Sequence, residues 1–387
     1  MPTDLWAPRI VLEPVHEDFR RSFGAFLEKH VEAEYEMFEQ QQFVPREIWQ
    51  KAADSGFLMP DVPEKYNGVP DADFRFNVVI GEEINARALR GFGLSVHNDI
   101  VAPYLLSLGT EEQKEQWMPR LVEGRSIAAI AMTEPGAGSD LASIGMSAQR
   151  TDDGGFVLNG QKTFISNGQI ADFVIVVART NKDDAYGGLT LFLVEGDTPG
   201  FTRGKSLDKL GMHAQDTSEL YFDNVYLPAT SMLGEVNNAF TYLKANLARE
   251  RLSIAVGSMA AVERILERTI EFVKARPMFG RHLSDMQNTR FEIAELVTRA
   301  HAARALVDNC IEAYLNDELT PTRAAMVKMN TTSLQVETAD RCLQLHGGTG
   351  YMTETYIARM WRDGRPQTIY GGTTEVMKHI VGKDLLR

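Results

Sequence analysis

Four short segments of the chain combine small residues with hydroxyl, aromatic or carboxylate side chains at spacings that could serve a ligand. In the first, an apolar strand from Ile130 runs into Thr133–Asp140, where Gly136 and Gly138 stand among polar side chains. Glycines let backbone amides approach a polar ligand closely. A nicotinamide-binding fingerprint would need a third glycine where this chain has Leu141, so the sequence disfavours that cofactor.

The second segment is Gln161–Gly168. Side chains two positions apart on a strand share a face, so Phe164 and Ser166 are expected to present a ring beside a hydroxyl. Such a pair suits a flat heterocycle that stacks on the ring and forms a hydrogen bond at one edge. By itself the pattern is more typical of a core phenylalanine and a turn serine.

The third and fourth segments place glycines beside helix ends. Leu345–Tyr351 ends a helix that is predicted to begin near Met326. One glycine is enough to end a helix, whereas this segment has four small or flexible positions. In Ile369–Met377, Thr373 or Thr374 can cap the helix that follows, whose free amides could hold an anion or a carbonyl. Both segments predict that the backbone comes close to a ligand.

Three kinds of pattern follow one another along the chain and would position these segments. From about residue 15 to 128 the pattern is helical, with apolar residues at helical spacing from Phe19 onward and a capped helix start at Thr110. From about 129 to 235, pairs such as Asn159-Gly160 separate short apolar runs. These pairs predict hairpins and a mostly antiparallel sheet.

Helices return from about residue 236 to the end. Between Leu252 and Val273, and again between Leu296 and Tyr314, apolar residues step by three or four, which is typical of a bundle core. No strand–helix–strand alternation is present, which excludes a doubly wound fold. The sequence therefore predicts an α+β multidomain protein with a helical domain over residues 1–128, a β-domain over 129–235 and a helical domain over 236–387.

The composition of the 387-residue chain narrows the classes of function. Hydrophobic residues make up 44% and charged residues 24%, which is typical of a globular protein. The net charge of −13 argues against binding to nucleic acid, but it leaves room for a local basic pocket. With only Cys310 and Cys342, a disulfide framework and a cysteine-rich metal site are excluded, and no metal is expected. Because no signal peptide and no apolar run of about 18 residues is found, we expect a cytoplasmic protein without a membrane span.

Together, the four segments resemble the acyl-CoA dehydrogenase family, and the likeness covers essentially the whole chain. Thr133–Asp140 and His346–Tyr351 look like the family's two signatures, and Arg276–Gly280 with Gln287 is similar to its FAD-contacting segment from a neighbouring subunit. The fold implied has an N-terminal all-α domain, a middle antiparallel β-barrel-like domain and a C-terminal four-helix bundle. In the family, FAD binds between the β-domain and the bundle.

The resemblance implies FAD as the cofactor and assigns its contacts position by position. The flavin ring would be lined by the first two segments, with the Phe164 ring against it, and the pyrophosphate would lie near the third segment. The FAD-contacting positions are Met132, Thr133, Phe164, Ile165, Ser166, Arg276, Phe279, Gln287, Gln344, Leu345, His346, Gly347, Gly348, Thr373 and Glu375. The positions that contact acyl-CoA are Ser139, Arg251, Gly371 and Gly372.

The reaction implied is the α,β-dehydrogenation of a fatty acyl-CoA to its trans-2-enoyl-CoA. In the family a carboxylate removes the α-proton while the β-hydrogen leaves as hydride to flavin N5. The electrons then pass to an electron-transferring flavoprotein. Because the α-proton is weakly acidic, the thioester carbonyl must be polarised by fixed donors. The family uses a flavin ribityl hydroxyl and the backbone amide at the position of Gly371.

The catalytic base departs from the family's commonest pattern. Many members place a glutamate directly after the tyrosine of the fourth segment, where this chain has Gly371. A minority branch, which includes long-chain and isovaleryl-CoA dehydrogenases, carries it in a Glu-Arg-Leu context on an earlier helix. This chain has Glu250-Arg251-Leu252 at the matching place. The resemblance therefore implies Glu250 as the base, with Glu375 as the competing carboxylate.

Two other functions stay open at the level of the sequence. The same scaffold supports flavin oxidases and monooxygenases, in which reduced flavin meets oxygen and no flavoprotein partner is needed. Gly371 could also mark a non-catalytic acyl-CoA-binding flavoprotein, against which the presence of Glu250 argues. The resemblance further implies a homotetramer, with a dimer as the alternative. It leaves the length and branching of the acyl chain open.

Overall fold

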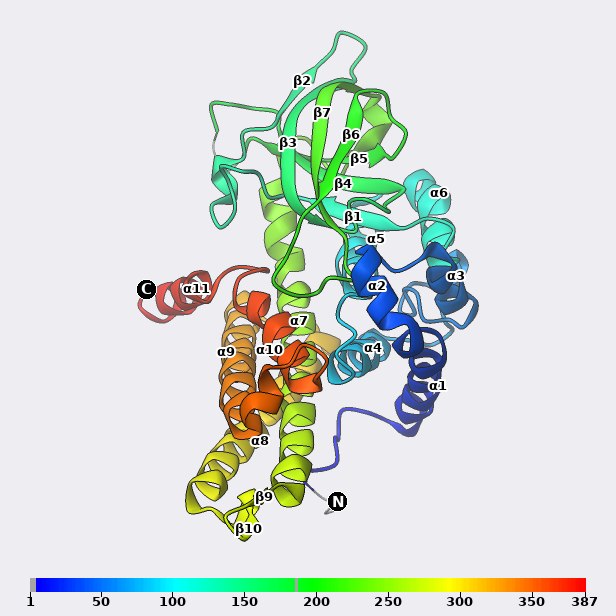
Figure 1. Ribbon diagram of the computed structural model, residues 1–387. Coiled ribbons are helices and arrows are strands. Elements are labelled where there is room, and N and C mark those ends of the chain that lie inside the picture. Colours follow the sequence, from blue (N-terminus) through cyan, green and yellow to red (C-terminus); the bar gives the residue numbers. More distant parts are fainter. Residues whose placement is uncertain (1–4, 185–186) are drawn as a thin grey trace. The chain divides into compact units, whose positions relative to one another are not determined.

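The computed structural model describes residues 5–184 and 187–387, which pack into two units (Figure 1). We name them the β unit, residues Glu28–Asp73 and Gly91–Leu247, and the helical unit, residues 5–27, Phe74–Arg90 and Ala248–Arg387. The domain boundaries proposed from the sequence at residues 128 and 235 remain a prediction, because this division follows packing rather than the continuity of the chain.

The β unit combines short helices with a sheet. Its helices are α2 (Tyr35–Gln41), α3 (Arg46–Asp54), α5 (Ala102–Leu108) and α6 (Glu111–Val122), with a π-helical turn at Val96–Val101. Its strands are β1 (Ala128–Ala131), β2 (Ser147–Arg150), β3 (Phe156–Ser166), β4 (Phe173–Arg179), β5 (Leu189–Glu195), β6 (Phe201–Ser206), β7 (Thr217–Leu227) and β8 (Met232–Leu233). The predicted cap of α6 is confirmed, since the Thr110 hydroxyl accepts from the Gln113 amide and the Gln113 side chain accepts from the Thr110 amide.

Within the described residues these strands form one eight-stranded sheet in the order β6-β7-β3-β2-β4-β5-β8, with β1 beside β4 (Figure 1). Neighbours are antiparallel, as predicted, except where β1 and the start of β2 pair with β4 in parallel. The hairpin predicted at Asn159-Gly160 is wrong, because this pair lies inside β3, where the register against β7 shifts. A Cβ at Gly160 would lie 2.8 Å from Met146 Cγ, so this glycine serves close packing between strands.

Strand β4 is buried on both faces. Alternate side chains of a strand point to opposite faces, so a strand between two cores reads as a continuous apolar run. One core contains Phe173, Ile175 and Val177 and also includes Trp117 of α6, whose ring centroid lies 4.6 Å from that of Phe173. The other core contains Val174, Val176 and Ala178. Helix α6 therefore covers one face of the sheet.

The helical unit consists of helices, most of which share one core. They are most of α1 (Pro14–His30), α4 (Phe74–Ala86), most of α7 (Ala239–Ala275), α8 (Gln287–Leu315), α9 (Pro321–His346), α10 (Tyr356–Gly364) and α11 (Thr374–Leu385). Helix α9 packs against α8, α10 and α11 (Figure 1). The predicted apolar stripes lie on α7 and α8, and their buried members share a core with residues of α4 and α9.

The order of helices, strands and helices confirms the predicted α+β fold class. Helix α9 begins at Pro321 rather than near Met326, because the Thr320 hydroxyl accepts from the Arg323 amide and caps the helix there. In the part of the chain that the structure describes, no helix is both long and apolar enough to cross a membrane.

A buried carboxylate ties the N-terminal segment and α4 to the rest of the helical unit. Glu82 of α4 accepts hydrogen bonds from Arg9, from Arg20 at 2.8 Å and from Arg304 of α8 at 2.9 Å. Arg304 in turn donates to Glu263 of α7 at 2.7 Å. Burial alone would raise the pKa of Glu82, but the three arginines outweigh it and lower the pKa to about 2. This network joins four segments that are distant in sequence.

We expect Glu82→Gln to lower the free energy of unfolding by about 3 kcal/mol, because it removes the charge on which three arginines converge. Urea denaturation at pH 7 measures this loss. The contribution is present above pH 4.5 and disappears as the pH falls through about 2, so the difference between the two proteins should shrink over that range.

Asp18→Asn serves as the control, because Asp18 pairs with Arg21 in the same helix and both side chains are exposed. It should cost less than about 1 kcal/mol. An equal loss for the two variants would show that the Glu82 network contributes no more than a surface pair.

Candidate functional site

The turn formed by Gly371 and Gly372 in the helical unit has a backbone that glycine adopts most readily. Their φ angles are +65° and +94°, both in the left-handed region. A Cβ at Gly371 would lie 2.5 Å from Ile254 Cδ1, and one at Gly372 would lie 2.6 Å from Met377 Cε. A side chain at position 371 would therefore need a strained backbone and would displace Ile254.

The face of α7 that carries Glu250 lies against this turn. Residues four apart on a helix are neighbours, so Glu250 and Ile254 share a face. Ile254 borders the space beside Gly371, and Arg251 Nε donates to Gly371 O at 3.3 Å. Glu250 and Arg251 are each only 6% exposed. The structure thus brings together a buried carboxylate on α7 and the predicted substrate-binding residues Arg251, Gly371 and Gly372.

Two buried cations hold the turn by its carbonyl oxygens. Besides Arg251, Lys328 of α9 donates from Nζ to Gly372 O at 2.6 Å. The Lys328 side chain is fully buried. Burial and repulsion from Arg251 lower the pKa of Lys328 to about 8, against the attraction of Glu375. Burial also lowers the pKa of Arg251.

Helix α11 begins directly after the turn. The Thr373 hydroxyl accepts from the Val376 amide at 3.3 Å, so Thr373 is the cap of the two threonines that the sequence offers. Glu375 is exposed in the first turn, where a carboxylate is favourable beside the positive end of the helix dipole. These two predicted FAD-contacting residues therefore flank the amides of a helix N-terminus.

The C-terminal end of α9 leaves its backbone open. A Cβ at Gly347 or at Gly348 would meet no atom of the described residues within 4 Å, and Gly347 has a φ of +59°. Gln344 is exposed and Leu345 is half-buried. This geometry fits the close backbone approach that the sequence predicts here.

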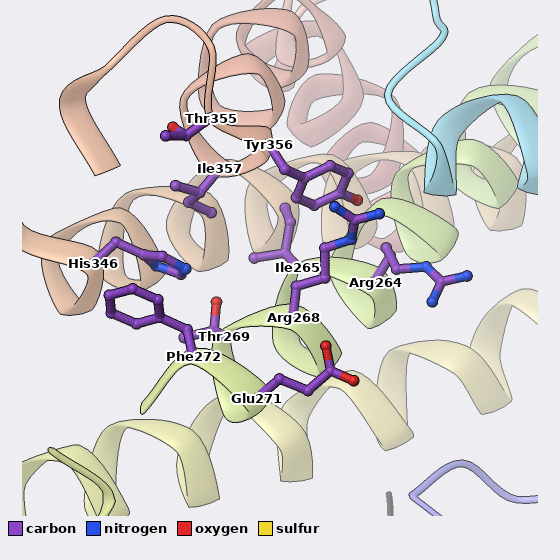
Figure 2. Close-up of a pocket in the computed structure, with 10 residues that line it drawn as sticks. All are labelled: Arg264, Ile265, Arg268, Thr269, Glu271, Phe272, His346, Thr355, Tyr356 and Ile357. Atoms are coloured by element: carbon purple, nitrogen blue, oxygen red, sulfur yellow. The ribbon is translucent and has the colours of Figure 1, made fainter. Parts of the chain in front are cut away.

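His346 lies beside a cavity of about 410 Å³ lined by α7, the end of α9 and the start of α10 (Figure 2). Its ring stacks on Phe272 with the centroids 4.2 Å apart, and its Nδ1–H donates to Cys342 O at 2.9 Å. Burial lowers the pKa of His346. In the same cavity, the Arg268 guanidinium lies 4.1 Å over the ring of Tyr356 (Figure 2). The His346 ring thus has a stacking partner and a hydrogen-bond partner within the helical unit.

Three predicted FAD-contacting residues lie on or beside the small hairpin of β9 (Pro277–Met278) and β10 (Arg281–His282). Phe279, at its tip, is 92% exposed and has a φ of +49°. Arg276 and Gln287 are exposed as well. An exposed ring held by a hairpin suits a contact outside the subunit. The contact across a subunit interface nevertheless stays a prediction.

In the β unit, a bulge of β3 lies at the predicted pair of Phe164 and Ser166. Two residues of β3, Thr163 and Phe164, lie opposite a single residue of β7, and Phe164 has a φ of +59°. Phe164 is 67% exposed and Ser166 half-buried, while Ile165 between them is buried in the sheet core. The side chains of Phe164 and Ser166 thus lie outside the core. The side chain of Ile165 lies inside it, so only the backbone of Ile165 can contact a ligand. Bulges commonly re-aim side chains beside functional sites.

The segment from Met132 to Ser139 is anchored by a buried ion pair that the sequence reasoning missed. Lys162 of β3 donates to Met132 O at 2.9 Å and to Glu134 Oε1 at 2.8 Å. Glu134 also accepts from the amide of Gly145 at 2.7 Å. Burial lowers the pKa of Lys162 to about 8, against the charge of Glu134. Ser139 itself is exposed.

A sequence signal exists for only one of the two missed lysines. Lys162 adjoins the buried Thr163 inside a strand, where alternation would place the two side chains on opposite faces, so the pattern does not predict its burial. Lys328 stands at a core position of the helical repeat of α9, four residues after Ala324 and three before Thr331, both buried. A charge at a core position needs a partner, and here each lysine has a backbone carbonyl.

Three observations, each made within one of the two units, show that the residues present fit FAD. An exposed aromatic ring stands at a bulge of the sheet, an open glycine backbone ends α9, and a capped helix N-terminus begins α11. Flat rings stack on exposed aromatic faces, and phosphates favour free amides at helix ends. In the described ranges, no group of three or more His, Cys, Asp or Glu side chains could hold a metal ion.

Three family models match the chain in order. They are described as acyl-CoA dehydrogenase N-terminal domain, over residues 13–125, middle domain, over 129–225, and C-terminal domain, over 237–386. Together they span most of the chain and confirm the resemblance that the four segments indicate.

Relatives and solved structures agree with these matches. The mitochondrial long-chain specific acyl-CoA dehydrogenase of Rattus norvegicus is 42% identical over 99% of this chain and 89% of the relative. The mitochondrial isovaleryl-CoA dehydrogenase of Solanum tuberosum is 30% identical over 98% of this chain and 92% of the relative. The crystal structure of an acyl-CoA dehydrogenase from Geobacillus kaustophilus superimposes with a TM-score of 0.95 at 43% identity, over 98% of this chain and 100% of that one.

We expect Gly371→Ala to lower the free energy of unfolding by about 1–2 kcal/mol, because its left-handed backbone disfavours a Cβ. Gly382→Ala is the matched control, since a Cβ there meets no described atom and the residue lies inside α11. That control should gain up to about 1 kcal/mol. Thermal unfolding checks both, and equal shifts would contradict a constrained turn.

Proposed function

The chain belongs to the acyl-CoA dehydrogenase family, and on this premise we propose that Glu250 is the base that removes the α-proton of a fatty acyl-CoA. The protein is an FAD-dependent oxidoreductase that acts on fatty acyl-CoA and forms the trans-2-enoyl-CoA. When bound, FAD supplies the acceptor for the hydride that leaves the β-carbon. The chain's own residues supply the base, the polarisation of the carbonyl and the binding of both molecules.

One observation carries the assignment of Glu250. Position 371, where many members have glutamate, is a left-handed glycine whose missing side chain would meet Ile254. Glu250 is buried one helical turn before Ile254, on the same face of α7. A carboxylate from α7 can therefore serve the substrate beside this turn without a side chain at position 371. Glu375 is exposed on α11, which favours a contact with FAD over a role as the base.

The residues that would hold FAD are those whose geometry fits it. In the β unit, the exposed ring of Phe164 would pack against the flavin, and the backbone from Met132 would lie at its polar edge. In the helical unit, the open backbone of Gly347 and Gly348 and the amides that follow Thr373 would receive polar groups of the cofactor. Exposed Arg276 of a second subunit would pair with a phosphate.

We further propose that an electron-transferring flavoprotein takes the electrons and that the chain forms a homotetramer. The support for both is membership of the family. A flavin oxidase or monooxygenase on the same scaffold is the alternative for the electrons. Oxygen consumption with acyl-CoA in the absence of any acceptor distinguishes these enzymes, since a dehydrogenase consumes little oxygen. A non-catalytic flavoprotein would show neither oxygen consumption nor bleaching of the flavin.

We expect Glu250→Gln to slow the anaerobic bleaching of bound flavin by acyl-CoA by about 10²- to 10⁴-fold, because the amide cannot accept the α-proton. FAD should stay bound, since the assignment gives Glu250 no contact with the cofactor. Stopped-flow absorbance with a panel of acyl-CoA chain lengths measures the rate. The panel also identifies the preferred acyl group.

Glu271→Gln is the matched control, because Glu271 is exposed on the same helix. Its bleaching rate should equal that of the wild type. Bleaching of Glu250→Gln at a near wild-type rate would make the assignment wrong, and so would a loss seen only with Glu375→Gln.

A further inference from the structure

Lys328 is a buried charge that the proposed mechanism does not yet use. It lies at a core position of α9 with 0% of its surface exposed. Its ammonium donates to Gly372 O at 2.6 Å. Glu375, the carboxylate whose charge acts on it, is itself exposed. Burying an ammonium group costs free energy. Because Lys328 is buried and binds a backbone carbonyl, we infer that the position of this carbonyl matters for function.

The two cations fix the direction of two successive peptide groups. Arg251 binds Gly371 O, and Lys328 binds Gly372 O. In a planar trans peptide the C=O and N–H bonds point in opposite directions, and the chain contains no cis peptide in its described part. The N–H groups of Gly372 and Thr373 therefore point away from Arg251 and Lys328, respectively.

The amides of this turn are available to a ligand. Among the residues that the structure describes, those of Gly371, Gly372 and Thr373 donate no hydrogen bond within the chain. The two cations are bonded to the carbonyl oxygens of the first and second peptides after the Gly371 amide, so they fix the position of this amide. Hydrogen bonds with a charged partner are also stronger than neutral ones, so the turn is held firmly.

We propose that Lys328 is a positioning residue of the acyl-CoA site. Its ammonium, with the Arg251 guanidinium, holds the Gly371–Gly372 turn in place and so keeps the Gly371 amide in position to donate to the thioester carbonyl. The inference rests on the function proposed above. Lys328 acts through the turn and has no contact of its own with the substrate.

The test compares Lys328→Met, Lys328→Arg and Thr332→Val in the oxidised holoenzyme. Methionine keeps the length of the side chain without its charge, and arginine keeps the charge. Thr332 is the control, because it is buried one turn further along α9 and its hydroxyl bonds only to Lys328 O. FAD content and thermal unfolding of each variant establish that it is folded.

The first measurement is the infrared stretch of the thioester carbonyl in bound trans-2-enoyl-CoA that carries ¹³C at that carbon. Binding to the wild type should lower its frequency, because the turn polarises the carbonyl. Lys328→Met should lose at least about half of this shift, whereas Lys328→Arg and Thr332→Val should keep most of it. A role in packing alone would not change the polarisation.

The second measurement is the rate of flavin reduction by acyl-CoA. Loss of one oxyanion donor typically slows a reaction about 10²- to 10³-fold, so loss of support for the donors in Lys328→Met should slow it about 10- to 10²-fold with little change in KM. An unchanged carbonyl shift and rate in Lys328→Met would overturn the proposal. Equal losses in Thr332→Val would overturn it too. If none of the acyl-CoAs reduces the flavin of the wild type, the proposed function fails instead.

The pH dependence gives a further reading. The charged groups that act on Lys328 are Arg251 on α7 and Glu375 on α11, and with burial they bring its pKa to about 8. The ammonium is lost as the pH rises through 8, so flavin reduction by the wild type should slow there. Lys328→Met should lack this decline. A decline that persists in Lys328→Met belongs to another group and counts against the proposal.

Discussion

The candidate site in the helical unit depends on one constraint, the turn of Gly371 and Gly372. Its backbone is left-handed, and buried cations bind both of its carbonyl oxygens. Gly371 leaves no room for a side chain, and the face of α7 beside the turn carries the buried carboxylate of Glu250 together with Ile254. Because the carbonyls need donors, α7 supplies Arg251 and α9 supplies Lys328. The arrangement depends on α7 staying in place. The network of Glu82, Arg304 and Glu263 links α4, α8 and α7 in the same unit.

The β unit uses the same physical device. Lys162 is buried, its pKa is lowered by burial, and it donates to the carbonyl of Met132, at the start of the predicted flavin-contacting segment. In each unit a buried lysine thus fixes a loop by its backbone instead of facing a ligand. Glu134 balances the charge of Lys162 directly, whereas Lys328 has Arg251 as its near neighbour. The second site therefore keeps more positive charge, which is favourable beside a carbonyl that becomes negative during α-proton removal.

Much of the fold could be predicted because it follows from local patterns. The apolar stripes of α7 and α8, the cap at Thr110 and the run of β4 all depend on spacing along a single element. The errors arose where a partner strand or a cap intervened. Asn159-Gly160 has the composition of a hairpin turn, but it lies in the middle of β3, where Met146 packs against the glycine. The bulge before Ile165 could not be predicted either, because its position depends on the pairing of β3 with β7.

The sequence by itself determined the family and the cofactor, because these depend on residue types at given spacings. It also led to the proposal that Glu250 replaces the glutamate that is missing at position 371. Only the tertiary structure decided why position 371 is a glycine, which carbonyls Arg251 and Lys328 bind, and which four segments the network of Glu82, Arg304 and Glu263 joins. The physical reason is that a buried charge is stabilised by partners from other elements. No periodicity along one element can identify those partners.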